Sequence, residues 1–143
     1  MKACPMPQTY DASKEFAGKR VVLVSVPGAF TPGCHARHLP PYIDNLDKLT
    51  EKADLVVFIA SNDSFVMAAW GKANGIGDSS KIRFMSDSKT FFGKEHGWLA
   101  GVGDRLQRFA MIIEKDGTVS YAQSETSPKE VSVSGAEAVL AKL

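Results

Sequence analysis

The residues best suited to chemistry surround a cysteine at the start of a predicted helix. The stretch Pro27–Cys34 reads PGAFTPGC and follows an apolar, strand-like segment. Thr31 is a good N-cap residue and Pro32 a good first helical residue. Cys34 then lies in the first helical turn, where free backbone N–H groups and the helix dipole stabilise a thiolate. This context favours a reactive, readily ionised thiol over the buried, inert cysteine that is otherwise the commoner case.

Three other uses of this cysteine fit the sequence less well. A dithiol site of the Cys-x-x-Cys type is excluded, because the other cysteine lies 30 residues upstream. Cys34, His35 and His38 suggest a metal site, but adjacent helical positions point apart and three ligands make a poor zinc site. A Cys–His protease would need a distant base such as His96, and nothing around His96 resembles that machinery.

Unbroken apolar segments predict the strands that must position Cys34. Val21–Val26 and Asp54–Ala60 are rich in β-branched residues and show no polar alternation. This pattern is typical of strands that are buried on both faces by helices. Three further strands are predicted, the last two as a hairpin around the turn KDG: Lys81–Met85, Phe109–Glu114 and Thr118–Gln123.

Helical patterns separate these strands. Tyr42, Leu46 and Leu49 recur at helical spacing, and Asp63 is a good N-cap for a helix with Val66, Ala69, Trp70 and Ala73 on one face. Ser134 is the expected N-cap of a final helix. The alternation of strands and helices predicts one α/β domain with three layers. We expect an N-terminal arm over residues 1–19, which carries Cys4, and the domain itself over residues 20–143.

Composition narrows the class of protein. The chain has 143 residues, is 44% hydrophobic and carries a formal net charge of +1. This balance favours neither nucleic acid nor an anionic membrane as a partner. No apolar run reaches the length that spans a bilayer. Two cysteines are too few for a disulfide-stapled secreted scaffold, so we expect a reducing, cytoplasmic environment.

The stretch Pro27–Cys34 resembles the active-site signature of the peroxiredoxins, Pro-x-x-x-Thr-x-x-Cys, at Pro27, Thr31 and Cys34. With the following His38-Leu39-Pro40, it is similar to the short fungal alkyl hydroperoxide reductases and their mammalian mitochondrial and peroxisomal relatives. The resemblance runs from residue 3 to the end of the chain. Other matching segments are Asn62–Asp63, Ala69–Gly71, Ser86–Asp87 and Arg108–Met111.

The resemblance implies a thioredoxin-like three-layer fold with a central mixed sheet and a thiol-dependent peroxidase acting on hydrogen peroxide and alkyl hydroperoxides. Cys34 would attack the peroxide, Thr31 would orient it and Pro27 would shield the thiolate from water. Arg108 would stabilise the thiolate and the leaving oxygen, with Arg105 as its competitor. No metal and no other cofactor is expected.

The resemblance also suggests how oxidised Cys34 is resolved. The mammalian branch has a second cysteine near the C-terminus, but residues 124–135 contain none. Cys4 is then the resolving candidate, as in the fungal branch, and would form a disulfide with Cys34 of the neighbouring subunit in a homodimer. A thioredoxin-type protein would reduce it. A one-Cys peroxidase and a non-enzymatic peroxide sensor or redox relay remain as alternatives.

The last three residues bear on localisation. Ala141-Lys142-Leu143 differs by one small residue from Ser-Lys-Leu, a peroxisomal address. A peroxisomal location is therefore an alternative to the cytoplasm, and an ordinary helix end explains these residues equally well.

Overall fold

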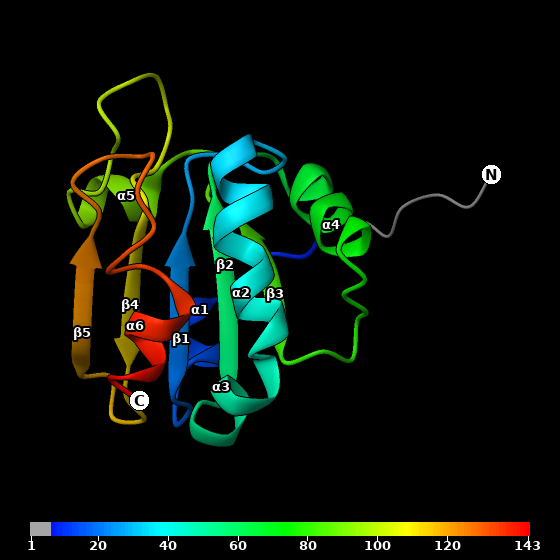
Figure 1. Cartoon of the computed structure of the whole chain (residues 1–143), viewed down its shortest axis with the longest axis vertical. Coiled ribbons are helices and arrows are strands. Elements are labelled where there is room, and N and C mark those ends of the chain that lie inside the picture. Colours follow the sequence, from blue (N-terminus) through cyan, green and yellow to red (C-terminus); the bar gives the residue numbers. More distant parts are fainter. Residues whose placement is uncertain (1–6) are drawn as a thin grey trace.

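Five strands form one mixed sheet in the computed structural model, which describes residues 7–143 (Figure 1). In spatial order its strands are β3 (Ile82–Ser86), β2 (Leu55–Ala60), β1 (Val21–Ser25), β4 (Phe109–Ile113) and β5 (Val119–Ser124). β1, β2 and β3 run parallel, β4 is antiparallel to β1, and β5 is antiparallel to β4. The mixed sheet is therefore confirmed.

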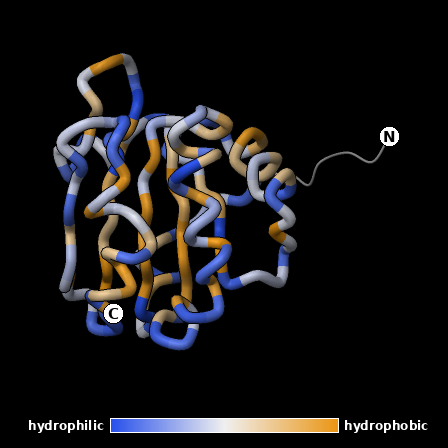
Figure 2. The backbone as a smooth tube through the Cα atoms, viewed as in Figure 1, coloured by the Kyte–Doolittle hydropathy of each residue, from blue (hydrophilic) through white to orange (hydrophobic). Residues whose placement is uncertain are grey.

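The two strands with continuous apolar sequence lie inside the sheet. Every residue of β1 and β2 is buried, and both strands lie within the ranges predicted for them. Figure 2 shows hydrophobic residues along these central strands and hydrophilic ones in the turns at the lower end of the sheet in this view. The β5 strand lies at an edge and leaves most of its residues exposed. Burial on both faces thus explains the missing alternation in the β1 and β2 sequences.

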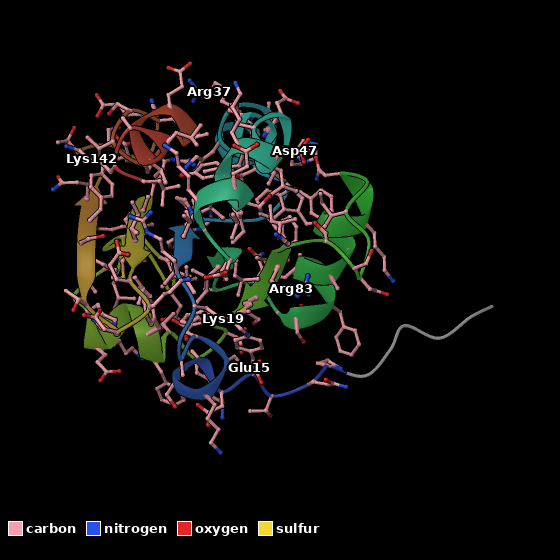
Figure 3. All side chains as sticks on the ribbon, turned by 90° about the horizontal axis from the view of Figure 1, so that it is seen from below. Glu15, Lys19, Arg37, Asp47, Arg83 and Lys142 are labelled. Carbon is pink, nitrogen blue, oxygen red and sulfur yellow. The ribbon has the colours of Figure 1, made fainter. Side chains whose placement is uncertain are left out.

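Helices cover both faces of the sheet and complete three layers (Figures 1 and 3). The larger core cluster joins β1 and β2 to the helices of one face, which are α2 (Leu39–Asp44), α3 (Leu46–Lys52), α4 (Ser64–Ala73) and α6 (Ala136–Leu140). On the other face lie α1 (Ala12–Glu15) and α5 (Phe91–Glu95), where Phe16 and Phe92 pack against a second cluster. This is the expected thioredoxin-like architecture.

Two helix details differ from the sequence predictions. The periodic segment from Tyr42 to Leu49 forms α2 and α3, separated at Asn45, whose side-chain amide donates to the Pro41 carbonyl. Asparagine competes in this way with helical hydrogen bonds. Ser134 is not the N-cap of α6, which begins after Gly135, because the Ser134 hydroxyl bonds to Glu125 instead.

In α4 the predicted N-cap is correct, but only part of the predicted apolar face is buried. Asp63 accepts hydrogen bonds from the N–H groups of Phe65 and Val66. Trp70 is buried, but Ala69 and Ala73 are exposed. The bulky indole of Trp70 packs on the rings of Phe58 and Phe84, and this sets the rotation of the helix.

Part of the predicted arm is described by the structure. The α1 helix lies within residues 1–19, whereas Cys4 lies outside the described residues. In residues 7–143, no helix is both long and apolar enough to cross a membrane.

Candidate active site

Cys34 follows the carboxyl end of β1, in the first turn of the next helical segment. That segment begins at Pro32, and the Thr31 carbonyl accepts a hydrogen bond from the His35 N–H at 2.8 Å. Residues Cys34–His38 form a short π-helix, η1. Sequence reasoning predicted the first-turn position but not the π-helix, a form that is frequent at functional sites. The Cys34 side chain is only 1% exposed.

A strained turn leads into this helix. Phe30 adopts a φ of 59°, in the left-handed region that bulky residues avoid. Two hydrogen bonds hold the turn: the Ala29 N–H donates to Asn62 Oδ1 at 2.8 Å, and the Thr31 hydroxyl donates to the Gly28 carbonyl at 2.7 Å. Because its proton is used there, the Thr31 hydroxyl can only accept a hydrogen bond from a substrate. The sequence predicted that the Thr31 side chain caps the helix, but its hydroxyl bonds to the Gly28 carbonyl instead.

Arg108 reaches Cys34 because of the strand pairing. β4 is antiparallel to β1 and pairs Phe109 with Ser25, so the start of β4 lies beside the end of β1. Arg108 is 3% exposed, and its Nη2 donates to Cys34 Sγ at 3.3 Å. A Cβ added at Gly33 would lie 3.1 Å from the same Nη2, so glycine allows this close approach. Arg105, the competing arginine, is exposed.

The other partners of the Arg108 guanidinium carry no negative charge. Nε and Nη2 donate to the Pro128 carbonyl at 3.2 and 2.9 Å, and Nη1 lies 2.7 Å from His38 Nδ1. Among residues 7–143, no carboxylate lies within salt-bridge distance of Arg108. Removing one partner of a buried charge pair is costly, by about 3–5 kcal/mol in measured cases. The thiolate of Cys34 is the anion that this arrangement favours.

His38 is a site residue whose role sequence reasoning missed, since from the sequence we considered it as a metal ligand and set that use aside. It is fully buried between Arg108 and Ser134. Arginine has only donors, so His38 Nδ1 must accept, and Nε2 must carry the proton that it donates to the Ser134 carbonyl at 2.8 Å. Burial, with the Arg108 charge as a smaller cause, lowers the pKa of His38 to about 4. His38 is thus a neutral acceptor that orients Arg108.

This buried histidine predicts acid sensitivity. In the unfolded chain the His38 pKa is near 6.5, whereas in the folded protein it is about 4. Between these values the unfolded state binds the extra proton, so stability falls as the pH falls through this window, by about 3 kcal/mol in total. Urea unfolding across the window should show the slope, and His38→Gln should flatten it. The control His96→Gln replaces an exposed histidine and should keep it. An unchanged slope in His38→Gln would contradict the predicted linkage.

The remaining candidates lie apart from the thiol or lack a defined role. His35 turns to Trp70, whose indole N–H donates to its Nδ1 at 2.9 Å. The His96 ring packs at a tilt against Phe92, which contacts the core on the α5 face of the sheet. Across residues 7–143, no three His, Cys, Asp or Glu side chains are grouped so as to hold a metal ion. Pro27 is partly buried in the loop before Cys34, and its shielding role stays a prediction.

Comparison with known proteins places this geometry in a family. The redoxin family model matches residues 1–140. Peroxiredoxin AHP1 of Chaetomium thermophilum is 49% identical over 100% of this chain and 81% of its own length. A relative from Lipomyces kononenkoae, named for the peroxisome, is 40% identical over 99% of this chain and 86% of its own.

A solved structure agrees with these relatives. Reduced Prx3 from Vibrio vulnificus superposes with a TM-score of 0.79 at 44% identity, covering 90% of this chain and 83% of that one. Family, sequence and fold therefore lead to the same result: this chain belongs to the peroxiredoxins, enzymes that reduce peroxides with a reactive thiol.

Proposed function

We propose that Cys34 is the thiol that reduces hydrogen peroxide and alkyl hydroperoxides. Its thiolate attacks the terminal peroxide oxygen, an S–O bond forms and the O–O bond breaks. The sulfur is oxidised to sulfenic acid, and the other oxygen leaves as water or an alcohol once protonated. Arg108 stabilises the charge that develops on the two oxygens, and Thr31 accepts a hydrogen bond from the peroxide. Pro27 shields the thiolate from water.

One observation carries this proposal: the buried guanidinium of Arg108 lies 3.3 Å from the buried Cys34 sulfur without a carboxylate partner among the described residues. An inert structural cysteine would not need a buried positive charge beside it. Guanidinium does not lose its proton, so it stabilises the thiolate without taking part in proton transfer. The site is thus suited to nucleophilic attack by sulfur.

We further propose that Cys4 of a neighbouring subunit resolves the sulfenic acid. Its thiol attacks the Cys34 sulfur, a disulfide forms and water leaves, and a thioredoxin-type protein then reduces the disulfide. Cys4 is the only other cysteine in the sequence. Since the Cys34 side chain is buried, the first turn of its helix must unwind before the sulfur reaches a partner. The functional unit is then a homodimer, with residues 1–19 as an arm on a domain of residues 20–143.

This resolution step predicts a covalent dimer. After one equivalent of hydrogen peroxide, the wild-type protein should run as a dimer on a non-reducing gel, and Cys4→Ser should run as a monomer. Thioredoxin with its reductase should return the wild-type dimer to monomer. A monomer without free thiols would show an intrachain disulfide. A monomer with a free Cys4 thiol and a Cys34 sulfenic acid would show a one-Cys enzyme, and either result would overturn the proposal.

The proposed location is the cytoplasm, with the peroxisome as the alternative. The Lipomyces relative is named for the peroxisome, and Ala141-Lys142-Leu143 approximates the peroxisomal address. In the structure, however, Arg20 Nη1 donates to the Leu143 carbonyl at 2.9 Å, and the Leu143 side chain packs against the core. An import receptor would first have to release this segment.

A further inference from the structure

The loop from Glu125 to Ser134 supplies two backbone carbonyls that orient the side chains around Cys34. The Pro128 carbonyl accepts from Arg108 Nε and Nη2, and the Ser134 carbonyl accepts from His38 Nε2. His38 in turn contacts Arg108 through its other ring nitrogen. The position of the guanidinium beside the sulfur therefore depends on where this loop holds both carbonyls.

Glu125 is the side chain that holds the two ends of the loop together. Its Oε1 accepts from the Ser132 N–H, the Ser134 N–H and the Ser134 hydroxyl, and its Oε2 accepts from the Ser132 hydroxyl, at 2.6–2.8 Å. Burial alone would raise the pKa of Glu125, but these four hydrogen bonds together lower it. The Glu125 N–H also donates to the Arg108 carbonyl at 2.9 Å.

The middle of the loop is exposed and is also contacted from another element: Arg37 Nη2 donates to the Lys129 carbonyl at 3.1 Å. Residues 128–130 are exposed, including Pro128 itself. The neighbouring carboxylate of Glu130 accepts a hydrogen bond from the Thr126 hydroxyl within its own turn, at 2.6 Å. The Tyr42 and Tyr121 hydroxyls also hold the far end of the loop, by donating to the Ser134 and Val133 carbonyls at 2.7 and 2.6 Å. Glu125 joins that end to the start of the loop, and it does so through serines rather than by pairing with Arg108. This leaves the positive charge of Arg108 free to stabilise the thiolate.

We propose that Glu125 is a positioning residue of the peroxidase site: by fastening the Glu125–Ser134 loop, it holds Arg108 at the Cys34 sulfur. This inference rests on the proposed function of Cys34 and Arg108. It assigns the carboxylate a geometric role, in which hydrogen-bond reach matters more than charge. A glutamine has the same reach and can bond to both serines, whereas an aspartate keeps the charge but is one methylene shorter.

The experiment compares Glu125→Ala, Glu125→Gln and Glu125→Asp with the matched control Glu130→Ala. Stopped-flow kinetics give the rate constant for oxidation by hydrogen peroxide, and ultraviolet absorbance against pH gives the fraction of thiolate. Glu125→Ala should react roughly tenfold slower, a smaller loss than removal of a direct stabiliser causes, and its thiolate should form at higher pH. Glu125→Gln should react faster than Glu125→Asp, and Glu130→Ala should match the wild type.

A double variant tests whether Glu125 acts through Arg108. Two residues that act through one contact show non-additive effects. Arg108→Ala/Glu125→Ala should therefore react no more slowly than Arg108→Ala alone. If the rate constant of the double variant falls by the product of the two single-variant factors, the proposal is overturned. A faster reaction of Glu125→Asp than of Glu125→Gln would also overturn it. If Glu125→Ala does not fold, the order of the Gln and Asp variants still decides.

The thiolate measurement separates this inference from the proposed function. If the wild type does not react with peroxide, the function proposed for Cys34 is wrong. The thiolate fraction of the variants still shows whether Glu125 holds Arg108 at the sulfur. If the wild type reacts and Glu125→Ala matches it in both measurements, only the role of Glu125 is wrong.

Discussion

Replacing Cys34 with serine should abolish peroxide turnover. A serine hydroxyl in the same first helical turn remains protonated and cannot act as the sulfur nucleophile that accepts the peroxide oxygen. The buried site and its strand pairings should persist, because the change removes no packing group larger than one atom. Peroxide consumption with a thioredoxin system is the measurement, and circular dichroism shows that the variant is folded.

Cys4→Ser is the matched control for Cys34→Ser. It also removes one sulfur, but it keeps the Cys34 thiol and should still consume one equivalent of peroxide per subunit. Substantial turnover by Cys34→Ser would show that Cys34 is not the reacting thiol. Equal loss of the first oxidation in both variants would point to a structural effect of the cysteines instead.

Arg108→Ala should slow the reaction of the thiol with peroxide by about 10²–10³-fold, as expected when one electrostatic stabiliser is lost. The change removes the donor that lies 3.3 Å from the Cys34 sulfur and the buried positive charge that favours its thiolate. The thiolate absorbance should therefore appear at higher pH than in the wild type. Stopped-flow kinetics across several pH values measure both effects.

Arg105→Ala is the matched control for this second prediction. Arg105 precedes Arg108 by three residues and is exposed. Its loss should leave the rate with hydrogen peroxide close to that of the wild type. If Arg105→Ala proves the crippling change and Arg108→Ala is mild, the arginine has been assigned wrongly.

The parts of the site that were predictable are those encoded locally. The apolar run of β1, the Thr31–Pro32 helix start and the position of Cys34 depend on neighbours within a few residues. Arg108 was identified through the family resemblance, and the structure then supplied the reason for its position: antiparallel pairing of β4 with β1. No local pattern around residue 108 indicates which part of the chain it will contact.

The unpredicted parts depend on backbone groups and long-range contacts. The carbonyls of Pro128 and Ser134 hold Arg108 and His38, but a carbonyl is present at every residue and leaves no mark in the sequence. His38 had one available signal, since it lies four residues after Cys34 on the same helical segment. Ser134 was misassigned as a helix cap because the bond to Glu125 crosses nine residues and competes with the local role.

The most direct test of the account is the mass of the Cys4→Ser variant after one equivalent of hydrogen peroxide. This variant lacks the proposed resolving thiol, so the sulfenic acid should persist and the intact mass should rise by one oxygen atom. Dimedone, which traps sulfenic acids, should then label the peptide that contains Cys34. An unchanged mass, or an oxygen found on a methionine while the Cys34 thiol stays free, would contradict the claim that Cys34 reduces the peroxide.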